Sequence, residues 1–260
     1  MDLGLKDRVA IVTGGNRGIG YAISAALLAE GAHVVVASLD PARNAEAVGK
    51  LKSGGRVVGV PTDLNDAAAV ENLFKTTLAE FGHLDILINN ATTISQGSFF
   101  AMTEESWDHA FDNKLRGTVR CIRHAIPPMR ERKWGRIVNI SGGAAWTPQL
   151  GAITTGMNNA AVQNLTVALA NELGKDGILV NAIVPTAVRT ERHDKNIRDA
   201  MAKTGQSEAE VLKPRVAKIP LGRMGTAEEI ASVAVFLSSE RASFVNGSAW
   251  AVDGGVSARL

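Results

Sequence analysis

The stretch RVAIVTGGNRGIG, residues 8–20, decides the fold class of this chain. Residues 8–13 are a short apolar run rich in β-branched side chains, which predicts a strand, and a helical pattern follows from Ile19 to Glu30. Glycines between a strand and a helix let the backbone approach a pyrophosphate, which rests on the helix N-terminus. Because the glycines stand in this context, we predict a dinucleotide-binding turn. The alternative is a glycine-rich turn without a ligand.

The rest of the chain continues the alternation of strands and helices. Apolar runs predict further strands at 32–38, 56–60, 83–90, 135–141, 178–184 and 248–255. Strands with near-continuous apolar character are buried on both faces, which implies a parallel sheet covered by helices. We therefore predict an α/β fold, a three-layer Rossmann-type doubly wound parallel sheet, in a single domain spanning residues 1–260.

The predicted helices carry local start and stop signals. Helical patterns lie at 41–52, 66–81, 104–132, 153–174 and 226–238. Asp66 is a typical N-cap and Gly82 a typical helix stop, while Thr226 and Glu229 form a capping box. The Pro127-Pro128 pair is expected to kink or end the long helix.

One segment, at about 189–215, does not follow the alternation. It is polar and highly charged, and it lies between a predicted strand and a predicted helix. Long connections of this kind are often active-site lids, so a substrate lid is one interpretation. A solvated surface excursion is the other.

Composition excludes several classes of function. With 28 basic and 26 acidic residues the net charge is +2, which excludes bulk binding to nucleic acid. The single cysteine, Cys121, excludes an intramolecular disulfide and a zinc–cysteine site, and no metal site is expected. The first residues lack the apolar stretch of a signal peptide, and no apolar run approaches a membrane span. We expect a cytoplasmic protein with no membrane and no nucleic-acid partner.

With its motifs placed, the chain resembles the short-chain dehydrogenase/reductase family over its whole length. The matching stretches are Thr13–Gly20 in the glycine loop, Asp63-Leu64, Asn89-Asn90-Ala91, Ser141, Asn181 with Pro185 and Thr190, and Asp253-Gly254-Gly255. The resemblance implies an NAD(P)-dependent oxidoreductase that acts on a small carbonyl or hydroxyl compound. It also implies a homotetramer or homodimer formed through the long central helices.

The same resemblance implies the cofactor-binding residues. They are Gly14, Asn16, Arg17, Gly18, Ile19, Gly20, Ser38, Asp63, Leu64, Asn90, Ala91, Pro185, Val188 and Thr190. An acid at the end of the second strand would bind the ribose hydroxyls of NAD, but this place holds Ser38. The missing acid and the Arg17 guanidinium favour NADP(H) over NAD(H), and a chain without cofactor is the alternative.

The sequence departs from the family at its proton relay. The family carries a Tyr-x-x-x-Lys motif, whereas this chain has Thr155 and Asn159 there; sliding by one gives Thr154 and Asn158. Neither threonine nor asparagine exchanges a proton near neutrality. The only tyrosine, Tyr21, follows the glycine loop. The usual relay is therefore expected to be absent.

A lysine stands on a neighbouring wall of the same site. Lys114 occupies the position where the family's long helix carries an asparagine. Three interpretations are open: it restores a positive charge near the cofactor, it is a catalytic amine whose pKa burial lowers, or it faces water. Thr92 and Thr186 replace two family glycines nearby, which also indicates a remodelled site.

Two functional hypotheses follow. The first is an enzyme in which Ser141, Lys114, Thr155 and Asn159 carry altered chemistry, either redox or a non-redox lyase, hydratase or aldolase reaction. The second is an inactive protein that binds a nucleotide or serves as a partner subunit. Expected substrate-side residues are Thr93, Ser95, Gln96, Trp146, Gln149, Arg189, Glu191 and His193. The basic long helix is expected to form ion pairs across a subunit interface, an anionic partner being the alternative.

Overall fold

The computed structural model describes residues 1–92, 97–148 and 150–257, and these form one parallel sheet with helices on both faces. The strands run β3-β2-β1-β4-β5-β6-β7 across the sheet. Their bounds are β1 Val9–Thr13, β2 His33–Ser38, β3 Val57–Pro61, β4 Ile86–Asn89, β5 Gly135–Ile140, β6 Ile178–Pro185 and β7 Ala249–Val252. The strand order reverses between β1 and β4. In a doubly wound sheet, ligands bind beyond the carboxyl ends of the strands at such a reversal.

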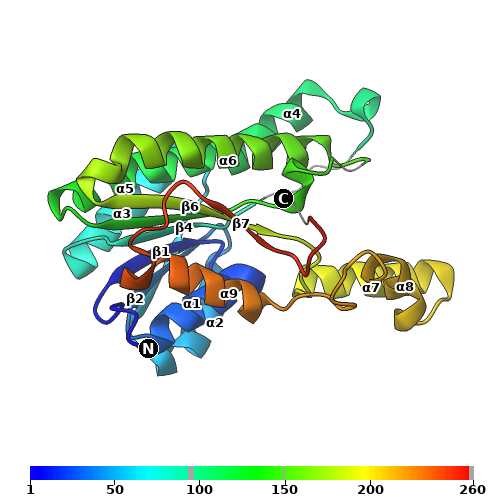
Figure 1. The fold of residues 1–260 in the computed structure, drawn as a ribbon, viewed down its shortest axis with the longest axis horizontal. Coiled ribbons are helices and arrows are strands. Elements are labelled where there is room, and N and C mark those ends of the chain that lie inside the picture. The colour runs from blue at the N-terminus through cyan, green and yellow to red at the C-terminus, as the bar shows by residue number, and fades with distance from the viewer. Residues whose placement is uncertain (93–96, 149, 258–260) are drawn as a thin grey trace.

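The helices form the two outer layers (Figure 1). Their bounds are α1 Gly18–Ala29, α2 Pro41–Leu51, α3 Ala67–Phe81, α4 Glu104–Phe111, α5 Gly117–Glu131, α6 Ile153–Leu173, α7 Glu191–Thr204, α8 Glu208–Val216 and α9 Ala227–Leu237. Buried apolar side chains join α1 and α9 to one face of the sheet, and α3, α5 and α6 to the other. The predicted three-layer, doubly wound α/β fold in a single domain is confirmed.

The local helix signals are also confirmed. The Asp66 side chain accepts a hydrogen bond from Ala68 N at 2.8 Å, and Gly82 ends α3 in the left-handed conformation, with φ +79°. At α9, Thr226 and Glu229 form both bonds of the capping box. These ends agree with the sequence because each depends only on residues a few positions apart.

The long helix predicted over 104–132 is interrupted. It consists of α4 and α5, joined by a π-helical turn at Asp112–Arg116, and Lys114 lies in that turn. The prediction that Pro127-Pro128 ends the helix is wrong, because both prolines lie inside α5, which continues to Glu131. Short π-helical turns often occur at functional sites.

The basic charge of this long helix is partly neutralised within the chain. Arg116 pairs with Asp112 at 2.7 Å, and Arg130 pairs with Asp176 at 2.7 Å. Arg120 donates to the backbone carbonyl of Leu64 at 2.9 Å. These arginines therefore have partners without a second subunit.

The segment at 189–215 contains helices α7 and α8, which extend beyond the sheet (Figure 1). The two helices are held together by Arg189, whose guanidinium bonds Asp194 and Glu208, each at 2.9 Å. Ile197 of α7 and Val211 of α8 are buried. The segment is thus a folded helical pair rather than an irregular excursion.

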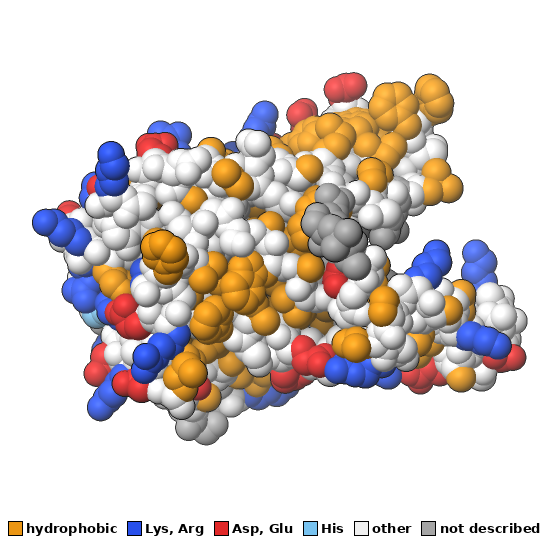
Figure 2. Space-filling view, in the orientation of Figure 1, with side chains coloured by type: hydrophobic (Ala, Val, Ile, Leu, Met, Phe, Trp, Pro, Cys, Tyr) orange, Lys and Arg blue, Asp and Glu red, His pale blue; other side chains and the backbone are white. Residues whose placement is uncertain are grey.

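A second projection carries α4 and the aromatic residues before it. Phe99 and Phe100 are exposed, and Figure 2 shows apolar side chains gathered over this projection. The ring centroids of Phe99 and Trp107 lie 6.1 Å apart, edge to face. In Figure 1 both projections extend to the same side of the molecule, beyond the ends of the strands.

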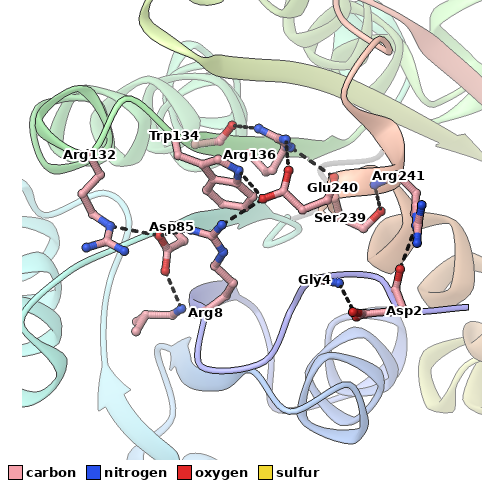
Figure 3. A network of polar contacts seen from close by, with 12 residues as sticks. Asp2, Gly4, Arg8, Asp85, Arg132, Trp134, Arg136, Ser239, Glu240 and Arg241 are labelled. Atoms are coloured by element: carbon pink, nitrogen blue, oxygen red, sulfur yellow. Dashed lines mark hydrogen bonds and ion pairs between the residues drawn. The ribbon is translucent and has the colours of Figure 1, made fainter.

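A polar network connects residues at the opposite side of the sheet, where the strands begin (Figure 3). The buried carboxylate of Asp85 accepts from Val9 N at 3.0 Å and from the guanidiniums of Arg8 and Arg132, each at 3.2 Å. The Trp134 ring lies under the Arg8 guanidinium at 3.7 Å, and its Nε1 donates to Glu240 at 2.9 Å. The network joins the starts of β1, β4 and β5 to the segment after α9.

Replacing Asp85 by alanine is expected to lower the free energy of unfolding by about 3 kcal/mol, since it leaves the buried backbone N–H of Val9 without its acceptor and removes the counter-charge of Arg8 and Arg132. Denaturant unfolding measures the change. The matched control is Glu46→Ala, which removes the exposed pair with Lys50 and is expected to cost less than about 1 kcal/mol. Equal losses in the two variants would contradict the structural role of Asp85.

Candidate functional site

A cleft of about 440 Å³ opens beyond the carboxyl ends of β1, β2 and β4. The glycine loop forms one wall. Gly14 and Gly18 have positive φ angles of +64° and +53°, which favour glycine. A Cβ at Gly14 would lie 2.9 Å from Asn90 Nδ2, and one at Gly20 would collide with the carbonyl oxygen of Gly14. The loop can turn this tightly only because these positions lack side chains.

Hydrogen bonds between β1 and β4 form the floor of the cleft. Asn90 Nδ2 donates to the carbonyl oxygens of Thr13 at 3.0 Å and Gly14 at 3.3 Å. Thr13 Oγ1 accepts from the backbone N–H groups of Asn90 at 3.0 Å and Ala91 at 3.1 Å. The floor is thereby pre-formed, and the residues present fit a dinucleotide against the loop backbone.

Most of the predicted cofactor-binding residues come together here. Those that line the cleft are Gly14, Asn16, Arg17, Gly18, Ile19, Ser38, Asp63, Leu64, Asn90, Ala91 and Thr190, with Thr92 beside them. Gly20, Pro185 and Val188 are not among the lining residues; Val188 instead forms a β-bridge with Gly225.

Sequence reasoning missed several lining residues, among them Arg43, His109, Asn113 and Arg192. Arg192 comes two residues after the predicted Thr190, and Arg43 begins the helix after the second strand. Both arginines lie in the first turn of a helix that follows a strand of the sheet, and this position could have identified them from the sequence. His109 and Asn113 had none, because their place depends on the α4–α5 connection.

The contacts of α6 distinguish Asn158 from Asn159. Asn159 is buried beside the end of β5: its carbonyl oxygen accepts from Ser141 Oγ at 3.1 Å, and a Cβ on Gly142 would lie 2.8 Å from its Nδ2. Asn158 turns to α4 instead, and donates to the carbonyl oxygen of Ala110 at 2.9 Å. Asn159 therefore lies beside Ser141, and Thr155 stands one turn before it on α6.

The hydroxyl of Ser141 has one hydrogen-bond acceptor and one donor as partners. It donates to Asn159 O and accepts from Gln163 Nε2 at 2.9 Å. Gln163 Oε1 in turn accepts from Trp146 Nε1 at 2.7 Å. A chain of hydrogen bonds thus links Ser141 to Trp146.

Trp146 lines a second and larger cavity, of about 660 Å³. This cavity also receives Thr186 from the end of β6 and residues of β7 and the start of α9. Thr186 thus lies at this second cavity and is not among the residues that line the glycine-loop cleft, whereas Thr92 is. The hydrogen-bond chain makes this cavity a candidate place for a substrate beside Ser141.

Lys114 is buried, with 4% of the residue exposed. Its Nζ donates to the carbonyl oxygen of Ile140 at 2.5 Å, one residue before Ser141. Burial lowers the pKa of the amine to about 8, and no carboxylate among the described residues pairs with it. The interpretation that Lys114 faces water is wrong, because the π-helical turn directs it into the protein. A desolvated amine, with its pKa lowered to about 8, thus lies one residue from Ser141 at the end of β5.

The remaining residues predicted to contact the substrate do not come together in one place. Glu191 lines the glycine-loop cleft, while Arg189 is engaged in the ion pairs that join α7 to α8. Burial, together with Arg215, lowers the pKa of His193. Thr93, Ser95, Gln96 and Gln149 lie outside the described residues.

The described residues offer neither a metal centre nor a membrane span. They contain no group of three or more His, Cys, Asp or Glu side chains arranged to hold a metal ion. Within the same residues, no helix combines the length and the apolar character that crossing a membrane requires.

Comparison with known proteins gives full-length matches. A family model described as enoyl-(acyl carrier protein) reductase matches residues 14–257. A (2S)-[(R)-hydroxy(phenyl)methyl]succinyl-CoA dehydrogenase subunit of Thauera aromatica is 33% identical, covering 97% of this chain and 98% of the relative. A 3-oxoacyl-[acyl-carrier-protein] reductase of Aquifex aeolicus is 32% identical, covering 98% of this chain and 100% of the relative. The crystal structure of L-sorbose reductase from Gluconobacter frateurii, complexed with NADPH and L-sorbose, has a TM-score of 0.97 at 33% identity, with 100% of both chains covered.

Proposed function

We propose, from the premise that this chain belongs to the short-chain dehydrogenase/reductase family, that it binds NADP(H) in the glycine-loop cleft and acts on a small carbonyl or hydroxyl compound. The pre-formed cleft is the observation that carries the proposal. Its glycine turn admits a diphosphate, and its walls hold most of the residues that the family resemblance implies.

The end of β2 supports NADP(H) rather than NAD(H). Ser38 ends this strand, and its hydroxyl bonds Asn44 Oδ1 at 2.5 Å. The nearest acid, Asp40, caps α2 through Arg43 N at 3.1 Å and pairs with the Arg43 guanidinium at 3.4 Å. The carboxylate nearest in sequence to the end of β2 is thus engaged by Arg43, and NADPH is present in the structure of L-sorbose reductase.

Titration of the purified protein with the two reduced cofactors tests this proposal. We expect NADPH to bind at least tenfold more tightly than NADH, because a charge-assisted phosphate contact contributes about 1.5–3 kcal/mol. Nicotinamide fluorescence and thermal shift give the two affinities. Tighter binding of NADH would contradict the NADP preference, and binding of neither would overturn the proposed function.

The chemistry we propose does not use the usual relay. Bound NADP(H) would supply or accept a hydride. Neither Thr155 nor Asn159 titrates near neutrality, so the group available to gain or release a proton is the Lys114 amine. Ser141 would turn its hydroxyl from Asn159 O toward a substrate oxygen.

A non-redox reaction would use the same amine as a base. Desolvation keeps a fraction of Lys114 uncharged at neutral pH, as addition, elimination or carbon–carbon cleavage requires. A panel of small ketones, aldehydes and alcohols separates the two: a redox reaction consumes or forms NADPH stoichiometrically with product, and a non-redox reaction leaves it unchanged.

A second candidate is a nucleotide-binding subunit without catalysis of its own. It is favoured by the hydrogen bonds that join Lys114 and Ser141 to backbone carbonyls. One relative is itself named as a dehydrogenase subunit. NADPH binding with no turnover across the whole panel would support this candidate against the enzyme.

A further inference from the structure

The side chain of Gln163 stands between Ser141 and Trp146. It belongs to α6, one turn after Asn159, and the two ends of its amide have different partners. Nε2 donates to Ser141 Oγ at 2.9 Å, and Oε1 accepts from Trp146 Nε1 at 2.7 Å. None of these three residues lines the glycine-loop cleft, so binding of the cofactor does not account for their arrangement.

Trp146 determines which way the Gln163 amide faces. An indole N–H donates a hydrogen bond and never accepts one, so the carbonyl oxygen of the amide must face it. The amide nitrogen therefore faces Ser141, and this nitrogen donates and does not accept. Ser141 Oγ must accept from it, and the hydroxyl proton must go to another oxygen, here the carbonyl oxygen of Asn159 at 3.1 Å.

The loop after β5 holds Trp146 beside α6. It forms a short helical turn at Gly143–Ala145, closed by a backbone hydrogen bond of 3.0 Å from Trp146 N to the first residue of that turn. The turn lies so close to the helix that a Cβ on Gly156 of α6 would be 3.0 Å from Ala144 O. The packing of the backbone thus sets the distance between the indole and the amide.

This direction of the hydrogen bonds favours Ser141 as a donor. A hydroxyl that accepts one hydrogen bond donates the next one more strongly, because each bond polarises its neighbour. When a substrate oxygen takes the place of Asn159 O, no acceptor at Gln163 competes for the Ser141 proton.

We propose that Gln163 is a positioning residue that, oriented by Trp146, keeps Ser141 as the hydrogen-bond donor to a substrate oxygen. This inference rests on the proposed function, because Ser141 meets a substrate only if the chain is an enzyme. A carboxylate of the same shape would not serve, since it would accept from both neighbours and take the hydroxyl proton for itself. The arrangement suits a substrate oxygen that accepts, such as that of a carbonyl group.

The test exchanges the amide donor for an acceptor of equal size. In Gln163→Glu, turnover with NADPH is expected to fall about tenfold or more while NADPH affinity stays within about twofold, because only the donor to Ser141 is lost. As the pH falls through the pKa of the introduced carboxyl, its acid form donates again, so the rate relative to the wild type should recover. Gln163→Met, which has neither donor nor charge, is expected to show no such recovery.

The matched control is Asn164→Asp, which adds a carboxylate at the next position of α6. Successive helical side chains point about 100° apart and Asn164 is exposed, so its rate is expected to stay within about twofold of the wild type at every pH. A carboxylate that acted only through its charge on Lys114 would move the alkaline side of the pH profile, where that amine titrates, without a recovery at low pH.

A second measurement needs no substrate. The pKa of the carboxyl introduced by Gln163→Glu, followed by NMR, is expected to rise by about 1 when Ser141→Ala is added, since the ionised form loses a charge-assisted donor.

The outcomes separate this inference from the proposed function. An unchanged pKa in the double variant, or a loss of turnover that is the same at every pH, would overturn the role of Gln163 and leave the proposed function in place. A wild type without turnover on any compound of the panel would overturn the proposed catalysis and, with it, the role of Gln163 toward a substrate.

Discussion

Replacement of Lys114 by methionine is expected to reduce turnover at least about 100-fold while NADPH binding stays close to that of the wild type. Burial lowers the pKa of this amine to about 8, and the amine contacts the end of β5 one residue before Ser141. It does not line the glycine-loop cleft, so its loss is expected to spare the cofactor contacts. Initial rates on a substrate found in the panel, with NADPH titration alongside, measure both effects.

The same exchange is expected to stabilise the protein. Lowering the pKa of Lys114 from 10.5 to about 8 costs about 3 kcal/mol at neutral pH. The hydrogen bond to Ile140 O returns about 1 kcal/mol of this. Lys114→Met should therefore raise the free energy of unfolding near pH 7 by about 2 kcal/mol.

The pH dependence of this gain identifies its cause. The unfolded chain keeps the Lys114 proton up to about pH 10.5, whereas the folded chain releases it above about pH 8. The stability of the wild type therefore rises relative to the variant across that interval, and the advantage of the variant disappears above it. Urea unfolding at several pH values follows the trend. Full turnover in a stable Lys114→Met variant would remove the amine from the mechanism.

The double variant Thr155→Tyr with Asn159→Lys is expected to gain NADPH-dependent reduction of small ketones by about 100-fold or more. The register on α6 places both positions one turn apart and Asn159 beside Ser141. A tyrosine there would supply the phenol that the chain lacks, and the lysine would lower the pKa of that phenol. Adding Lys114→Asn removes a second ammonium from the same wall.

The control for this gain is Thr155→Phe with Asn159→Lys, which has similar bulk without the hydroxyl. The rate of NADPH oxidation separates the two variants. The same low rate in both, with NADPH still bound, would mean that proton transfer is not what limits this site.

Features that depend on neighbours in the chain were predictable. The caps at Asp66 and Thr226 require residues two or three positions apart, and the glycine turn needs only the strand before it and the helix after it. The parallel sheet could be predicted from the apolar runs, because strands that are apolar on both faces are typical of a parallel sheet covered by helices on each side.

Features that depend on the packing of distant segments could not be predicted from the sequence. A slip of one residue turns a helical side chain by about 100°, so Asn158 and Asn159 were equivalent until contacts with Ala110 and Ser141 separated them. The π-helical turn at Asp112–Arg116, which interrupts the predicted long helix, could likewise not be predicted from the sequence. Lys114 lies in this turn and is buried.

The amino-acid sequence by itself determined the doubly wound fold and the glycine loop. Only the tertiary structure decided that Lys114 is buried and that residues of the glycine loop and of α7 line one cleft. The physical reason is range: propensity, capping and apolar periodicity act within a few residues. Burial, charge pairing and the pKa of a side chain are set by whatever distant segments the folded chain brings against it.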